Sequence, residues 1–332
     1  MSFSCDFHSD SKKKSFADTQ NQLKTLLLEP NLDEATRYAI INRIARNLLA
    51  KNDYSSLILF LTEWVESHPD DEYNAYWLLM TAYAYRESDA APVASYYFER
   101  ILRNYNDLLV QNKSVHFLCL QELIQISTNS ANRISYFNEL ISRFPNEVST
   151  TELYMRLASE YEKEGEWDNA IKSLTQFLAQ DDAATIQITG IPNAYLSARQ
   201  IIDFNNSSKD WTFENLDALV VAVKQAISSY NWRALDRYKS KVNFFAMSWK
   251  QDETATNAQE NFSMHSFMLG NRIRYNEELD ESSSPTEAYL RTWGWSNYIN
   301  VWYLYFRKVN FPADPEIHGR WEWAGIYYGE KL

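Results

Sequence analysis

Four stretches of the chain can be aligned as copies of one helix-turn-helix unit, and this repeat constrains the fold more than any other feature. The copies begin at Tyr38, Ala75, Ser114 and Thr151, so they are offset by 37, 39 and 37 residues. A nearly constant offset in this range is typical of a helical solenoid, in which each hairpin buries its apolar face only against its neighbours. The repeat therefore predicts a stack of paired helices over residues 38–184.

The first and fourth copies carry the pattern most clearly, with large residues where the first helix packs, small residues where helices cross, and a turn residue between the helices. In the first copy these residues are Ile41, Ile44, Ala45, Leu48, Asn52, Tyr54, Leu61, Trp64, Val65 and Pro69. In the fourth they are Tyr154, Leu157, Ala158, Tyr161, Gly165, Trp167, Ala170, Leu174, Phe177 and Leu178. The pattern resembles the tetratricopeptide repeat. The resemblance implies a non-enzymatic array that recruits another protein or peptide; the alternative is an irregular amphipathic helical bundle.

The middle copies are more degenerate. The second has Asp89 in its turn and no closing proline, and the third has Gln121 and Arg133 where small residues belong. We therefore expect the third hairpin to splay or to bend the stack. Before the first copy, Asp33 is placed to cap its opening helix, because a carboxylate there accepts from free backbone N–H groups.

The resemblance also implies a partner groove, since the concave surface of such arrays is lined mainly by the first helix of each hairpin. The corresponding residues here are Asn42, Arg46, Tyr76, Leu79, Tyr83, Leu118, Glu122 and Met155. Only the first two suit a peptide-carboxylate clamp. We expect a groove with an aromatic middle that accepts an extended or helical apolar segment. The alternative is that the chain's own segment 181–204 fills the groove.

Composition excludes several other classes of function. The net charge is −12, without a basic stripe, which argues against nucleic acid as a partner. No apolar run is long enough to span a bilayer. The five histidines lack metal-ligand spacing, and no glycine-rich phosphate loop, Gly-x-Ser-x-Gly elbow or Cys-x-x-Cys pair occurs. We therefore expect no catalytic residues, no metal site, no cofactor and no enzymatic activity.

Cys5 lies in a context similar to that of the acylated cysteine in bacterial lipoproteins. It follows Ser-Phe-Ser and precedes a polar stretch within residues 1–17, which would form a flexible tether. The apolar segment expected upstream is absent. Two alternatives remain open: a mature lipoprotein, periplasmic or membrane-tethered through Cys5 alone, or a cytoplasmic chain in which Cys5 is an ordinary residue. Together with the repeats, the first alternative resembles bacterial, including spirochaetal, adaptor lipoproteins.

The remainder of the chain changes character. Helices are expected after a cap at Thr212 and around Trp232, followed by five runs rich in aromatic and β-branched residues with a period of two. These runs are Val242–Trp249, Met264–Tyr275, Ala288–Trp295, Asn300–Val309 and Gly319–Tyr328. Helices followed by strands predict a smaller α+β domain with an antiparallel sheet. The expected organisation is multidomain: a tether (1–17), an all-α solenoid of four hairpins with flanking helices (18–204) and an α+β domain (205–332).

Tryptophans suggest a second function for that domain. Trp293 and Trp295 are expected to share one strand face, as are Trp321 and Trp323, and such pairs can stack on sugar rings or enclose an apolar ligand. The domain would then bind a small molecule, lipid or glycan, with the repeats as a spacer. The alternative is that these side chains form the core of the sheet, with Glu322 on a solvated face. The acidic loop 277–281 lacks the spacing of a calcium site, so we expect a solvated turn.

Overall fold

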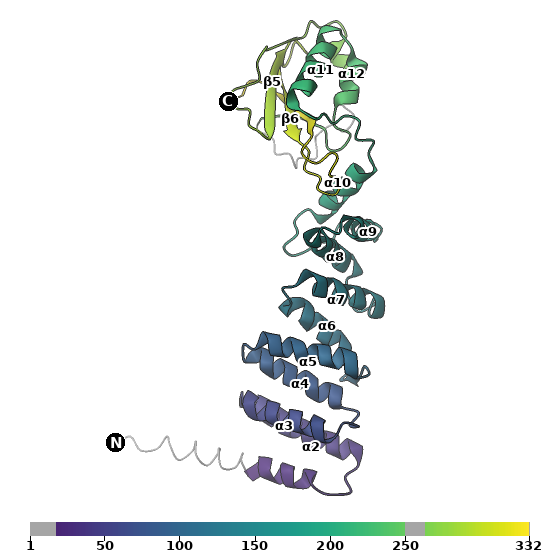
Figure 1. Ribbon diagram of the computed structural model, residues 1–332, viewed down its shortest axis with the longest axis vertical. Helices are drawn as coiled ribbons and strands as arrows, with labels where there is room; N and C mark the ends of the chain where they lie inside the picture. Colours follow the sequence, from purple (N-terminus) through teal and green to yellow (C-terminus); the bar gives the residue numbers. More distant parts are fainter. Residues whose placement is uncertain (1–17, 250–262, 332) are drawn as a thin grey trace, which may run out of the picture. The chain divides into compact units, whose positions relative to one another are not determined.

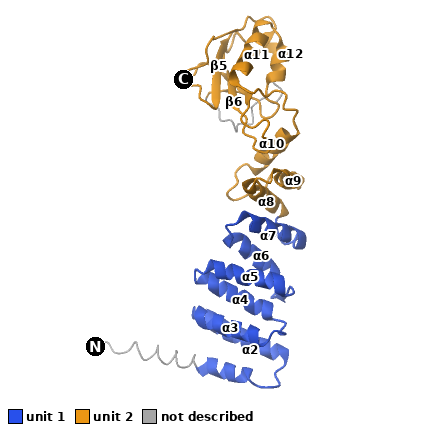
Figure 2. Ribbon diagram, viewed as in Figure 1, with its two compact units in different colours: residues 1–149 blue, residues 150–332 orange. Residues whose placement is uncertain are grey.

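The computed structural model describes residues 18–249 and 263–331. The chain forms two compact units, Met1–Ser149 (unit 1) and Thr150–Leu332 (unit 2), shown in Figure 2. A helical part is followed by a part with both helices and a sheet, as the sequence predicts. The division between the units falls after the third hairpin, whereas the sequence suggested a boundary at residue 205. Cys5, the tether and the loop 251–261 lie outside the described residues.

Unit 1 consists of successive helical hairpins, preceded by helical residues 18–27 (Figure 1). The pairs are α2 (Glu34–Leu49) with α3 (Tyr54–Ser67), α4 (Asn74–Glu87) with α5 (Ala91–Asn104), and α6 (Val115–Ile126) with α7 (Ser130–Arg143). Each helix packs against the next along the chain. The side chain of Asp33 accepts from the Thr36 backbone N–H at 2.8 Å, which confirms the predicted cap of α2.

The longer offset between the second and third copies comes from a short hairpin inserted before α6. Strands β1 (Leu109–Val110) and β2 (Lys113–Ser114) pair antiparallel around Gln111 and Asn112. Both turn residues have positive φ, 53° and 61°, as a two-residue hairpin turn that follows the right-handed strand twist requires. The hairpin spans residues 109–114 and ends at Ser114, the N-cap of α6, so the offset grows by two residues without a change in the helical pairing.

Arg133 in the third hairpin reaches the end of the neighbouring helix. Its guanidinium donates to the backbone carbonyl of Ile124 in the last turn of α6 and lies 5.5 Å from the centre of the Phe137 ring. The last carbonyls of a helix have no partner within the helix, so a cation there is favourable. Phe137 itself is fully buried. The long side chain thus acts on the helix end, while Gln121 is exposed.

Unit 2 begins with the fourth hairpin, α8 (Thr150–Glu164) and α9 (Trp167–Leu178), followed by α10 (Ala194–Asn206). α10 is one of the helices expected to flank the hairpins. Between α9 and α10 the chain makes turns, and its side chains pack on the hairpin: Ala183 and Ile188 lie in one core cluster with Met155, Leu174 and Phe177. The chain's own segment therefore covers this face of the fourth hairpin.

The rest of unit 2 is a mixed α/β arrangement (Figure 1). Its helices are α11 (Leu216–Ser228), α12 (Trp232–Tyr238) and α13 (His265–Met268). Its strands, in the spatial order β3-β7-β6-β5-β4, are β3 (Phe245–Ser248), β7 (Trp321–Tyr328), β6 (Val301–Lys308), β5 (Glu287–Trp293) and β4 (Arg274–Tyr275). The apolar residues of α11, spaced by three and four, face the core that they share with one side of this sheet.

Three sequence predictions for this part are wrong. The sheet is mixed because β3 pairs with β7 in parallel, although β4 to β7 form an antiparallel series. The expected strand over residues 264–275 is mostly α13 and a loop, with only its last two residues in β4. The N-cap of α11 is Asn215, whose side chain accepts from Ala218, and not Thr212. For the two strand predictions longer-range packing decided between locally similar alternatives, whereas the cap of α11 is a local hydrogen bond.

Candidate functional site

The predicted groove residues of unit 1 lie on the first helices of successive hairpins, α2, α4 and α6. We call their accessible surface the first-helix face, made of Tyr38, Asn42, Arg46, Tyr76, Tyr83, Leu118 and Glu122. Two predicted residues do not belong to it. Leu79 is buried in the interior of α4, and Met155 lies in unit 2 beneath residues 183–198. Both side chains are apolar and are covered by neighbouring elements. Their position within a helix does not indicate which neighbour covers them.

Tyr38 is the member of this face that sequence reasoning missed. Its ring centre lies 4.4 Å from that of Tyr73, 5.4 Å from Trp77 and 6.3 Å from Tyr76, so α2 and α4 meet through an aromatic cluster. Aromatic pairs at such separations stabilise beyond their buried area. The signal was present, because Tyr38 stands four residues before Asn42 and therefore shares its helix face.

A polar contact joins the other end of α4 to α6. Arg86 is ion-paired with Glu122, and its guanidinium carbon lies 5.1 Å from the centre of the Tyr83 ring. Burial raises the pKa of the Tyr83 hydroxyl, and the nearby Glu122 carboxylate raises it further. Tyr83 therefore stays a neutral hydroxyl, and the charge of Glu122 is already compensated within unit 1.

Arg46 and Asn42 on α2 are less fully engaged. Burial raises the pKa of Tyr76, and Arg46 acts in the opposite direction, which places the guanidinium near that hydroxyl. Among the described residues Arg46 has no carboxylate partner within ion-pair distance. The Asn42 side-chain oxygen is buried and accepts no hydrogen bond from the described part of the chain. This end of the face thus offers one exposed cation, Arg46, while the unused acceptor of Asn42 lies beneath the surface.

A cleft of about 290 Å³ adjoins the aromatic cluster. Its walls include Glu34, Arg37, Tyr38, His68 and Asp71. The Asp71 carboxylate accepts from two indole N–H groups, at 2.7 Å and 3.3 Å. The lining holds three carboxylates, Glu34, Asp70 and Asp71, against one arginine, Arg37, so the cleft is acidic on balance and does not suit an anionic ligand.

Three of the four candidate ligand tryptophans form the core of unit 2. Trp295, Trp321 and Trp323 are buried between the sheet and α11. Trp293 points to the other side of the sheet, so its predicted shared face with Trp295 is wrong. The strand alternation does not continue to Trp295, because β5 ends at Trp293 and Gly294, with a φ of +91°, turns the chain back toward the core. The structure thus places these three indoles in the core of the sheet, which was the alternative drawn from the sequence.

The second face of the sheet is aromatic and largely covered. The prediction that Glu322 lies on a solvated face is therefore wrong. Glu322 is only 2% exposed and accepts from Arg307 Nε at 2.8 Å and from the Trp211 indole at 3.2 Å. Farther along this face, Trp249 stacks on Tyr327 with ring centres 4.3 Å apart. A buried carboxylate is tolerated here because a cation and an indole N–H both satisfy it.

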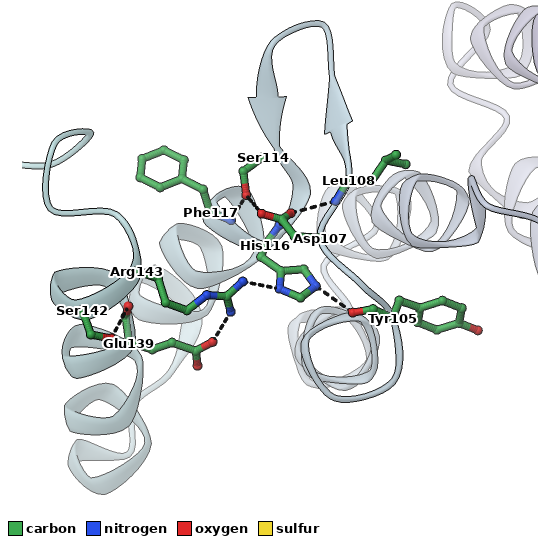
Figure 3. Close-up of polar contacts among 9 residues, drawn as sticks. All are labelled: Tyr105, Asp107, Leu108, Ser114, His116, Phe117, Glu139, Ser142 and Arg143. Atoms are coloured by element: carbon green, nitrogen blue, oxygen red, sulfur yellow. Dashed lines mark hydrogen bonds and ion pairs between the residues drawn. The ribbon is translucent and has the colours of Figure 1, made fainter.

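His116 lies in a buried polar network at the start of α6 (Figure 3). Its Nε2 donates to the Tyr105 carbonyl at 3.0 Å, and its Nδ1 accepts from Arg143 at 2.7 Å. Asp107 accepts from the Ser114 hydroxyl and the His116 backbone N–H, which ties the β1–β2 hairpin to the helix. Burial lowers the pKa of His116, so the ring is neutral in this arrangement.

This network does not make a catalytic pair. Cys119, one helical turn from His116, is fully buried, and burial raises the pKa of its thiol. The thiolate is the reactive form of cysteine, so this environment makes the side chain inert. Within residues 18–249 and 263–331, no group of three or more His, Cys, Asp and Glu side chains is arranged to hold a metal ion.

The acidic loop before β5 forms local turns, with Asp280 accepting from the Ser282 backbone and hydroxyl. None of the described helices combines the length and the apolar character needed to cross a membrane.

The fold thus defines a two-part protein, helical hairpins followed by helices on a small mixed sheet. Comparison of the chain with protein-family models and with curated proteins finds no match.

Proposed function

We propose that this protein is a non-enzymatic interaction scaffold whose tetratricopeptide-like hairpins bind another protein through the first-helix face. The observation that supports this most directly is a row of partly exposed tyrosines, Tyr38, Tyr76 and Tyr83, on two neighbouring first helices. Tyrosine and tryptophan dominate binding energy at protein interfaces because they bury a large area at a small entropic cost.

The charges on this face indicate which segment would bind there. Glu122 and Arg86 compensate one another, while Arg46 is exposed and without a carboxylate partner in the described chain. An amphipathic helix with apolar side chains spaced by three and four would cover the tyrosines. A carboxylate near one end of that helix would pair with Arg46. A C-terminal carboxylate clamp is not proposed, since it needs several cations from successive repeats.

Selection from a displayed library of amphipathic helical peptides on the full-length chain tests this proposal. We expect enriched peptides that lose about 100-fold or more in affinity for the variant with Tyr76→Ala and Tyr83→Ala, because two interface anchors are removed. Tyr96→Ala is the matched control, since Tyr96 is equally large and is exposed on α5, a second helix. Peptides that bind the double variant as tightly as the parent would show that the first-helix face is not the binding surface.

A further inference from the structure

A cavity of about 430 Å³ lies in unit 2, and none of its described lining residues belongs to the first-helix face. The end of α11, the start of α12 and α13 with its following loop form the walls. The lining includes Tyr230, Trp232, His265, Met268, Leu269 and Arg272. Small-molecule sites typically enclose roughly 300–1,000 Å³, so the cavity has the size of a ligand site.

Two of the apolar side chains that line it are left in contact with solvent. Tyr230 is 52% and Leu269 is 73% exposed, while Met268 forms a buried floor. The loop that carries Leu269 is fixed, because Asn271 donates to the carbonyls of Phe267 and Trp295 at 3.0 Å and 2.7 Å. The cavity is therefore preformed, and its apolar surface is available to a ligand.

Tyr230 is held in a conformation that favours glycine. Its φ is +56°, and among non-glycine residues with positive φ in the described chain it is the one aromatic residue. It occupies the position after the cap of α11, where Tyr230 N–H bonds to Ile227 and Asn231 N–H to Ala226. Glycine is usual at this position of such a helix end. Backbone strain of this kind gathers at sites where a side chain is needed for binding.

The lining of the cavity carries positive charge although the chain as a whole is acidic. Among the described lining residues Arg272 is a cation and none is an aspartate or glutamate, in a protein of net charge −12. Arg272 lines the cavity and is exposed, and Arg233 lies 4.4 Å from the centre of the Trp232 ring. His265 adds a second ring, 4.7 Å from that of Trp232. A ligand with a flat apolar body and one negative charge would match both properties.

We propose that this cavity binds a small amphipathic anion of the aromatic carboxylate class. The flat body packs against Tyr230, Trp232 and Leu269, and the carboxylate is bound by Arg272. A guanidinium offers two parallel N–H groups to a carboxylate, which gives direction as well as strength to the contact. This site is separate from the first-helix face and does not depend on the scaffold function.

Calorimetric titration of the full-length protein with 1-naphthoate, and with the neutral 1-naphthamide, tests the proposal. We expect naphthoate to bind about tenfold or more tightly than the amide, since a charge-assisted hydrogen bond corresponds to such a factor. Arg272→Gln should remove this preference, and Arg274→Gln, a nearby exposed arginine outside the lining, should keep it. Equal affinity for both compounds, or no binding of naphthoate at millimolar concentration, would overturn the proposal.

Tyr230→Gly separates binding from folding. Because glycine relieves the positive φ, the variant should unfold at the same or a higher denaturant concentration than the parent. It should nevertheless bind naphthoate at least about fivefold more weakly, since it lacks one wall of the cavity. Asn243→Gly is the control for glycine at a positive φ, with unchanged binding expected. Undiminished affinity of the Tyr230→Gly variant would show that the tyrosine is not held there for a ligand.

Discussion

Asp71 joins the first two hairpins through two tryptophans, and its replacement tests how much that junction contributes to stability. Its Oδ2 accepts from Trp64 at 2.7 Å and from Trp77 at 3.3 Å, and its Oδ1 accepts from the Tyr73 backbone at 2.9 Å. In the Asp71→Ala variant the fully buried indole of Trp77 loses its acceptor, which costs about 1–3 kcal/mol.

The hydrogen bond from Trp64 contributes a similar free energy, but in the variant water replaces part of it. A hydrogen bond to a charged acceptor contributes about 1.5–3 kcal/mol, and water can replace some of it because Trp64 lies at the edge of the core. The expected total for Asp71→Ala is therefore about 3 kcal/mol. Asp71→Asn keeps one acceptor oxygen, so it should lose about 1 kcal/mol.

Hydrogen exchange measured on peptides from α3 and α4 is the suitable assay, because the two units need not unfold together. A loss of about 3 kcal/mol corresponds to roughly 100-fold faster exchange of the protected amides. Asp70→Ala is the control, since Asp70 is exposed and accepts no hydrogen bond from the described residues. If Asp71→Ala changed exchange no more than Asp70→Ala, the two indole hydrogen bonds would not stabilise this junction.

Three further outcomes are expected. Burial lowers the pKa of His116, so as the pH falls below about 6.5 the imidazole becomes protonated in the unfolded chain before it does in the folded one. Unit 1 should therefore lose stability toward pH 5. Urea unfolding of the His116→Gln variant should show a smaller loss of stability between pH 7 and pH 5. Gly325→Ala places a Cβ about 2.6 Å from the ring of Phe245, which should cost about 1–3 kcal/mol in thermal unfolding and be relieved by Phe245→Leu. Glu322→Ala removes the carboxylate that accepts from the Arg307 guanidinium and from the buried Trp211 indole, so we expect a loss of about 2–4 kcal/mol by denaturant titration. Glu316→Ala, at an exposed position, should change the stability by close to zero.

The hairpins of the chain could be located from sequence because their signals are local. Asn52, Asp89 and Gly165 stand at the predicted turns, and all three have positive φ, between 55° and 74°. Asn, Asp and Gly tolerate this conformation best, so the residue type itself marks the end of the helix. The cap at Asp33 is equally local, since its acceptor and donor are three residues apart.

The candidate surfaces were only partly predictable. Tyr76, Tyr83 and Glu122 reach the first-helix face as their helical positions imply, but Leu79 is covered by neighbouring helices. The cavity beside Tyr230 was not foreseen. Its walls come from segments more than thirty residues apart, and the expected strand over residues 264–275 hid the short helix that closes it.

The sequence by itself determined the helices and turns of the four hairpins, and that two kinds of structure follow one another. The tertiary structure alone decided which faces are covered. Alternation in β7 separates Glu322 from Trp321 and Trp323, yet both faces proved to be buried. The carboxylate is covered by Arg307, its partner on the neighbouring strand β6, and by Trp211, which lies 111 residues away in the sequence. The parallel pairing of β3 with β7 was likewise open, since a long connection leaves strand direction free. Local periodicity reports the two sides of an element, whereas burial depends on what packs against each side.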